Sequence, residues 1–211
     1  SLLWYLNDPE YCQTLGFTPE TVIGIFAPNT YEFYWTQSVH TILQKFIDQY
    51  NRFWTTERKQ KAEKLKLTLP EVITLASIVQ AETAKDAEKP RIAGVYLNRL
   101  QIGMPLQADP TIIFGIGDFS IRRVTRVHTR SDSPYNTYLK RGLPVGPINS
   151  PSVSSIDAVL NAESHKYIYF CAKSDFSGFH EFAEDYEIHK KYARAYQDSL
   201  EVLLARKNSS K

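Results

Sequence analysis

A single acidic residue closes the most apolar segment of the chain. In LTLPEVITLASIVQAETA, residues 67–84, Leu75, Ile78 and Glu82 are spaced i, i+3 and i+7, so a helix places them in one row. Burial against an apolar face and the negative end of the helix dipole both raise the pKa of a carboxyl group. A carboxyl group that stays protonated near neutral pH can act as a general acid. Lys85 would oppose this rise if its side chain folded back.

A solvent-facing glutamate at a fraying helix end has the same spacing, so the residues alone leave both interpretations of Glu82 open. The other candidate acids are weaker. Asp109 precedes a proline, which is typical of a turn residue. Glu71 and Glu88 are expected to be surface acids. Gln80 lies off the row of Glu82 and cannot act as an acid.

The remaining polar residues form no cofactor or metal motif. The sequence has no phosphate-binding loop, no GxGxxG and no GxSxG. Four histidines lack the spacing of metal ligands and are expected to make ordinary hydrogen bonds: His128, His165, His180 and His189. Two segments combine hydrogen-bonding and aromatic side chains, which suits a sugar polymer: SPYNTY at 133–138 and PNTYEFYW at 28–35.

The composition is that of an ordinary globular protein. The chain has 211 residues and a formal net charge of +2, so electrostatics give no indication of nucleic-acid binding. Its two cysteines, Cys12 and Cys171, make no disulfide framework, and Cys171 is expected to be a buried free thiol. No apolar run is long enough to span a membrane. The first residues carry no targeting pattern, and we expect the chain to be part of a longer protein.

Helical and strand-like segments are mixed without a βαβ rhythm, which predicts an α+β fold. Hydrophobic periodicity predicts helices over 38–64, 67–84, 87–100, 151–161 and 185–206, with a short one inside 1–17. Thr68 and Glu71 fit a capping box. Strands are expected at Val22–Phe26, in KYIYFCA and in FHEFA, the last two joined as a hairpin. Residues 106–150 are expected to be mainly loop, and so long a loop is usually functional.

Several of these segments together resemble a known family. LASIVQAET, RIAGVYLNRLQIGMPLQADPTIIFG, SPYNTYLKRGLPVGPINSPS and the strand pair ending in FHEFA follow the order and approximate spacing of the YceG-like endolytic murein transglycosylases. The resemblance runs from about Ile23 to Tyr196. It implies a YceG-like catalytic domain with a glycan-binding cleft. Residues 1–66 would be the N-terminal part of the catalytic region, following a LysM-like region, and residues 67–211 the catalytic core.

The resemblance also implies an activity. Such enzymes cut the β-1,4 bond between N-acetylmuramic acid (MurNAc) and N-acetylglucosamine (GlcNAc) within peptidoglycan strands and leave 1,6-anhydro-MurNAc ends. They need no metal or cofactor. The parent protein would be anchored in the bacterial inner membrane, with its catalytic domain in the periplasm beside peptidoglycan synthases.

The family motif assigns the catalytic acid to Glu82. Two positions depart from the family pattern: Gln80 replaces an acid of the same motif, and Asn29 stands where many members carry Asp. Asn98 and Arg99 are expected to link helix and loop. Five further residues are expected to bind the sugar: Gln107, Asp109, Tyr135, Asn136 and Tyr138.

Three other functions remain open at this stage. A two-carboxylate hydrolase using Glu82 and Asp109 would release reducing sugars. A non-catalytic peptidoglycan-binding module would bind strands and leave them intact. A scaffold protein of the cell-wall machinery would bind partner proteins and show neither behaviour.

Overall fold

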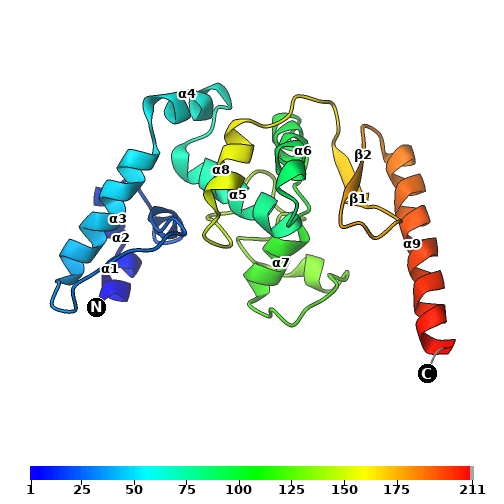
Figure 1. Ribbon diagram of the computed structural model, residues 1–211, viewed down its shortest axis with the longest axis horizontal. Coiled ribbons are helices and arrows are strands. Elements are labelled where there is room, and N and C mark those ends of the chain that lie inside the picture. Colours follow the sequence, from blue (N-terminus) through cyan, green and yellow to red (C-terminus); the bar gives the residue numbers. More distant parts are fainter. Residues whose placement is uncertain (210–211) are drawn as a thin grey trace.

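The computed structural model describes residues 1–209, with side chains as far as Arg206. Within them, nine α-helices and one two-stranded antiparallel sheet confirm the α+β class. Figure 1 shows α1–α3 at one end of the molecule, α5–α8 in the middle, and the strand pair with α9 at the other end. The helices are α1 (Leu2–Asn7), α2 (Pro9–Thr14), α3 (Val39–Phe53), α4 (Thr56–Lys64), α5 (Leu69–Glu82), α6 (Lys89–Gln101), α7 (Asp109–Ile116), α8 (Val153–Leu160) and α9 (Tyr186–Ser209). No helix within residues 1–209 is long and apolar enough to span a membrane.

Helix α5 lies at the centre of the main core. All eight residues from Val72 to Val79 are buried, and α6 and α8 pack against it. The predicted capping box is present: the Glu71 carboxylate accepts a 2.7 Å hydrogen bond from the Thr68 backbone N–H. The sequence predicted one apolar stripe, whereas the helix is buried on every side because neighbours surround it.

The N-terminal part has a small core of its own, formed by Cys12, Val22, Ile25 and Leu43. The strand expected at Val22–Phe26 is wrong: Val22–Ile25 form a 3-10 turn, η1. The backbone N–H of Val22 donates to the carbonyl of Thr18 at 2.9 Å, a local bond that replaces strand pairing. Within the described residues, strand pairing involves only the two later strands.

The single helix expected over 38–64 is divided into α3 and α4. Trp54 is buried and takes non-helical dihedral angles, φ −83° and ψ 72°. Thr55 then caps α4 by accepting a hydrogen bond from the backbone N–H of Arg58. Residues 55–61 contain no apolar side chain, so hydrophobic periodicity gives no signal at this break.

Residues 106–150 contain one more helix than expected. Asp109, expected in a turn, is the first residue of α7, and its neighbour Pro110 is tolerated because a first-turn N–H needs no helical partner. A short 3-10 turn, η3 (His128–Arg130), follows. The rest of this range is irregular apart from these elements, as predicted.

The predicted hairpin is confirmed. Strands β1 (Tyr169–Ala172) and β2 (His180–Ala183) pair antiparallel, with Tyr169 opposite Ala183.

Glu88, expected at the surface, is only 5% exposed. It lies in the 3-10 turn η2 (Asp86–Glu88), and its carboxylate accepts a 2.9 Å hydrogen bond from the His180 backbone N–H. Cys171 is a free thiol as expected, but half-buried rather than buried.

Close packing of α6 against the segment before β1 gives a test of the fold. A Cβ at Gly94 would lie 2.5 Å from the Glu163 carbonyl oxygen and 2.6 Å from the His165 Nε2. Alanine in a helix usually stabilises by about 1 kcal/mol over glycine, but here we expect Gly94→Ala to destabilise by about 1–3 kcal/mol. Urea denaturation measures the difference. Gln101→Ala, on the exposed side of α6, is the control and should change little; a stabilised Gly94→Ala would contradict the packing.

Candidate active site

Glu82, the last residue of α5, lines a pocket beside the main core. Its Oε1 accepts a 2.6 Å hydrogen bond from the hydroxyl of Tyr96 on α6. Tyr96 is 1% exposed, and its ring packs edge-on against Phe170 of β1 at 5.9 Å. Oε2 has no hydrogen-bond partner in the described part of the chain. The carboxyl group is therefore held at one oxygen and available at the other.

Burial raises the pKa of Glu82 to about 7, and the charge of Asp109 adds to the rise. The Tyr96 hydrogen bond and the charge of Arg99 act in the opposite direction. Lys85 does not fold back onto the acid, because its Nζ lies 5.1 Å from the centre of the Phe179 ring. Burial is therefore the main cause of the raised pKa that the sequence predicts for Glu82. A pKa near 7 populates both protonation states near neutral pH, so the group can donate a proton and later accept one.

The pocket has a volume of about 320 Å³ and a mixed polar and aromatic lining. The end of α5, the middle of α6, the segment before α7, strand β1 and the start of α9 all contribute to it. Its lining consists of Glu82, Tyr96, Arg99, Gln107, Asp109, Tyr138, Tyr169, Phe170, Tyr186 and His189. Aromatic faces beside hydrogen-bonding groups match the apolar faces and hydroxyl rims of sugars.

Arg99 joins two walls of this pocket. Its Nε donates to the Ile168 carbonyl at 2.7 Å, and its Nη1 donates to the Leu106 carbonyl at 2.5 Å. The amide of Asn98 donates to two carbonyls within 165–167, both at 2.9 Å. These contacts agree with the linking roles expected for Asn98 and Arg99. Helix α6 therefore fixes both the approach to β1 and the segment before α7.

Three of the five residues expected to bind sugar lie in the pocket with Glu82: Gln107, Asp109 and Tyr138. The Tyr138 hydroxyl donates a short hydrogen bond to the Asp109 carboxylate, and burial together with this contact raises the pKa of Tyr138. Gln107 has a φ of 50°, a left-handed conformation that is uncommon outside glycine. Such strain persists only where surrounding contacts hold it, and it concentrates at functional sites.

The other two residues, Tyr135 and Asn136, do not line the pocket. Asn136 is buried, and its Nδ2 donates to the carbonyls of Thr129 and Ser131 at 3.1 and 2.7 Å. The ring of Tyr135 packs edge-on against Phe114 at 4.7 Å. Both side chains hold the loop that follows α7 in place.

Several lining residues carry no sequence signal that singles them out. Tyr96 has the spacing of an ordinary apolar helix residue, and the ring of His189 stacks on Tyr169 at 5.2 Å. Burial lowers the pKa of His189, so the imidazole is neutral near pH 7. Its Nδ1 is buried and has no hydrogen-bond partner in residues 1–209.

Gln80 points away from the pocket. Its Oε1 accepts hydrogen bonds from the Ser152 backbone N–H at 2.7 Å and from the Ser155 hydroxyl at 3.1 Å. Its Nε2 donates to Asn149 at 3.3 Å. This residue therefore connects α5 to the start of α8 and does not line the pocket.

Two other features of the described chain lack this chemistry. Residues 1–209 contain no group of three His, Cys, Asp or Glu side chains that could hold a metal ion. A larger cavity of about 720 Å³ lies among α3, α4 and the start of α5. Its lining is mainly apolar, and its acid, Glu63, is exposed.

The raised pKa of Glu82 predicts a pH-dependent stability. Because the folded chain binds this proton more tightly than the unfolded chain, stability falls as the pH rises from about 4.5 to about 7. Glu82→Gln keeps an acceptor for Tyr96 but carries no charge. We expect this variant to match the unmutated chain below pH 4.5 and to melt several degrees higher above pH 7. Exposed Glu184→Gln is the control; equal melting curves for all three chains at pH 8 would disprove the raised pKa.

A second variant tests the hydrogen bond to the acid. Tyr96→Phe removes a contact that favours the ionised carboxylate, so the pKa of Glu82 should rise further above 7. Titration of the labelled carboxyl carbon by NMR measures it. Tyr50→Phe changes a partly buried tyrosine that does not line this pocket, and it should leave the pKa of Glu82 unchanged. An unchanged pKa in Tyr96→Phe would exclude this role.

Known proteins are similar to this chain in sequence and fold. The model of the YceG-like family matches residues 6–195. The chain is 37% identical over 153 residues to the endolytic murein transglycosylase of Bacillus subtilis, covering 72% of the chain and 42% of the relative. It is 31% identical over 157 residues to the endolytic murein transglycosylase of Streptococcus pneumoniae, covering 71% of the chain and 28% of the relative. The chain thus spans less than half the length of these relatives.

A solved structure agrees with the sequence comparison. A yceG-like protein from Listeria monocytogenes matches the fold with a TM-score of 0.76 at 29% identity, over 90% of this chain and 66% of that one. The family match includes Glu82 and every residue that lines its pocket. The chain belongs to the YceG-like family.

Proposed function

We propose that the chain is the catalytic region of an endolytic peptidoglycan lytic transglycosylase. It would cleave the β-1,4 bond between MurNAc and GlcNAc within glycan strands and thereby terminate or trim nascent strands. One observation carries the proposal: the Glu82 carboxyl has a pKa of about 7 and one unpaired oxygen in a polar and aromatic pocket. The names of the relatives from Bacillus subtilis and Streptococcus pneumoniae support it.

In the first step, protonated Glu82 acts as the general acid. Its proton passes to the glycosidic oxygen while the bond from that oxygen to C1 of MurNAc breaks, which frees the 4-hydroxyl of GlcNAc. Tyr96 holds Oε1, so the free Oε2 is the oxygen that faces the bond. Positive charge develops at C1, and the Asp109 carboxylate in the same pocket stabilises it.

In the second step, the Glu82 carboxylate acts as the general base. It takes the proton from the C6 hydroxyl of the same MurNAc, and the C6 oxygen forms the new bond to C1. The strand then ends in 1,6-anhydro-MurNAc, and Glu82 is protonated again. Water takes no part, so one carboxyl group serves both steps. Gln107 and His189 would bind sugar hydroxyls, while Tyr169 and Tyr186 would pack against sugar rings.

The cellular setting follows from the substrate. We propose that the catalytic region lies on the outer side of the inner membrane, in the periplasm, where glycan strands are accessible, and that the parent protein is anchored in that membrane. Peptidoglycan synthases are the proposed partners, because an enzyme that cuts nascent strands works where they are made. A cofactor has no part in the two steps.

Asp109 favours a second candidate function. It shares the pocket with Glu82 and influences the pKa of that residue. A hydrolase could use the Asp109 carboxylate to activate water or to form a covalent intermediate, with Glu82 as the acid. The two reactions differ in their products, since hydrolysis leaves a reducing MurNAc end and the transglycosylase leaves an anhydro end.

Mass spectrometry of digested peptidoglycan separates these functions. We expect internal fragments ending in 1,6-anhydro-MurNAc from the unmutated chain and from the control Glu184→Gln. Glu82→Gln should lose about 100-fold or more in rate, because it cannot transfer a proton. Asp109→Asn should be slower but give the same anhydro ends.

The other outcomes each point elsewhere. Reducing ends from the unmutated chain, abolished by Asp109→Asn, would establish the hydrolase. Binding to peptidoglycan without any cleavage would favour a glycan-binding module. Neither binding nor cleavage would favour a scaffold protein.

A further inference from the structure

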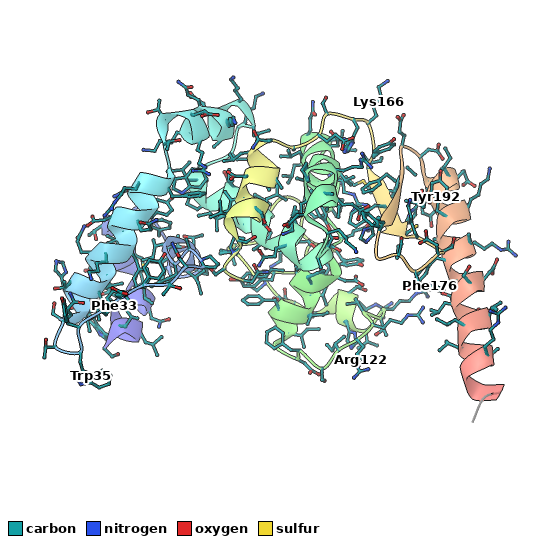
Figure 2. All side chains as sticks on the ribbon, viewed as in Figure 1. Phe33, Trp35, Arg122, Lys166, Phe176 and Tyr192 are labelled. Carbon is teal, nitrogen blue, oxygen red and sulfur yellow. The ribbon has the colours of Figure 1, made fainter. Side chains whose placement is uncertain are left out.

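Two aromatic side chains are largely exposed to solvent at the end of the molecule that carries α3. Tyr34 is 78% exposed and Trp35 is 102% exposed. Figure 2 shows Trp35 and Phe33 at the opposite end of the molecule from Phe176 and Tyr192. We call Tyr34 and Trp35 the aromatic tip. Tryptophan is a residue that folded chains usually bury, so an exposed one beside an exposed tyrosine indicates a binding surface.

The residues on the N-terminal side of the aromatic tip are anchored by several contacts, although Phe33 is still 36% exposed. The hydroxyl of Tyr31 donates to the Ala27 carbonyl at 2.9 Å. The rings of Tyr31 and Phe33 lie 4.6 and 5.6 Å from that of Phe46 on α3. Lys45 adds a third anchor: its Nζ donates to the Glu32 carbonyl at 3.0 Å. Residues 31–33 are therefore fixed to α3, while the next two side chains are left outside.

The tip itself closes a turn. The backbone N–H of Tyr34 donates to the Gln37 side-chain oxygen at 3.1 Å, and the backbone N–H of Gln37 donates back to the Tyr34 carbonyl at 3.0 Å. The Ser38 hydroxyl then accepts from the Thr41 N–H and caps α3. A backbone held on both sides loses little entropy when the tip binds a ligand.

The surroundings of the tip indicate the chemistry of its ligand. Residues 26–44 contain no Lys or Arg, and Glu32 is their only acid. The Lys45 ammonium on α3 is already engaged with the Glu32 carbonyl and the Phe33 ring. Anionic lipid headgroups or phosphates would need free cations, which this segment does not supply. Aromatic faces flanked by neutral amides and hydroxyls suit sugar rings, which pair an apolar C–H face with a hydroxyl rim.

We propose that Tyr34 and Trp35 form a second glycan-binding site, which packs against sugar rings of the peptidoglycan strand. This inference rests on the proposed function for the identity of the glycan. Helix α3 and the hairpin lie at opposite ends of the molecule (Figure 1), so the tip is a separate site from the Glu82 pocket. A second contact on the same polymer raises the local concentration of strand at the pocket. The tip thus serves retention on the cell wall, and the pocket serves cleavage.

Binding to insoluble peptidoglycan tests the proposal without depending on catalysis. Every chain carries Glu82→Gln to prevent cleavage, and co-sedimentation with intact sacculi and with peptide-free glycan strands gives the affinity. We expect Trp35→Ala with Tyr34→Ala to weaken binding to both materials by about tenfold, as for other ring-stacking contacts. Trp35→Phe should keep most of the affinity. The control is Phe119→Ser, which removes a 74% exposed aromatic from another loop and should have no effect.

Each other outcome is decisive. Equal affinity of the double variant and its parent, with equal melting temperatures, would overturn the proposal. If the double variant lost binding to vesicles of phosphatidylglycerol but kept its affinity for sacculi, the proposal would be overturned in favour of a lipid-binding surface. If the active chain cleaves no peptidoglycan but Trp35-dependent binding remains, the proposed function fails and the second site stands. If cleavage proceeds and binding ignores Trp35, only the second site fails.

Discussion

The free-energy cost of placing a carboxyl group at the end of a buried helix governs the rest of the site. Helix α5 is enclosed on all sides along Val72–Val79, so its C-terminal residue emerges beside the core rather than at the open surface. An ionised Glu82 is poorly solvated there, and its pKa rises to about 7. The Tyr96 hydroxyl offsets part of that cost by donating to Oε1. Reactivity and burial are thus two results of one packing arrangement.

Helix α6 makes this arrangement possible because it contacts the acid and holds two of the walls around it. Tyr96 contacts the acid directly, and Arg99 binds backbone carbonyls on both sides of the pocket. The buried Glu88, just before α6, holds the start of β2 through His180. A short hairpin has little stability alone, so its position depends on these polar contacts and on α9.

The sequence predicts those features that depend on neighbouring residues. The capping box at Thr68, the apolar course of α5 and the hairpin turn all follow from local spacing, whereas the spacing of Glu82 is compatible with both a buried and a solvent-facing side chain. The features it misses depend on tertiary contacts. Val22–Ile25 are β-branched and apolar apart from Gly24, yet no strand lies beside them among the described residues, so they form a 3-10 turn. Tyr96 looks like any core aromatic until α5 and α6 bring it within 2.6 Å of Glu82.

The same distinction separates the expected sugar-binding residues. Asp109 is the first residue of α7, and the loop that follows α7 brings Tyr138 back beside it. Their side chains therefore meet in the pocket. Tyr135 and Asn136 are equally polar and aromatic in sequence, but their side chains are used to hold that loop. Residue type alone therefore does not separate a binding side chain from a structural one. Only the direction in which the backbone presents each side chain does so.

The polar contacts of α6 also bear on how this protein tolerates changes in length. Strand β1 is attached to α6 through the Ile168 carbonyl and the carbonyls at 165–167, all of which precede the turn of the hairpin. That turn, residues 173–179, is largely exposed and contributes nothing to the pocket lining. Insertions or deletions there leave the anchoring bonds intact. The turn is thus tied to the site only indirectly, through the ring of Phe176, which lies 5.7 Å from that of Tyr196 on α9.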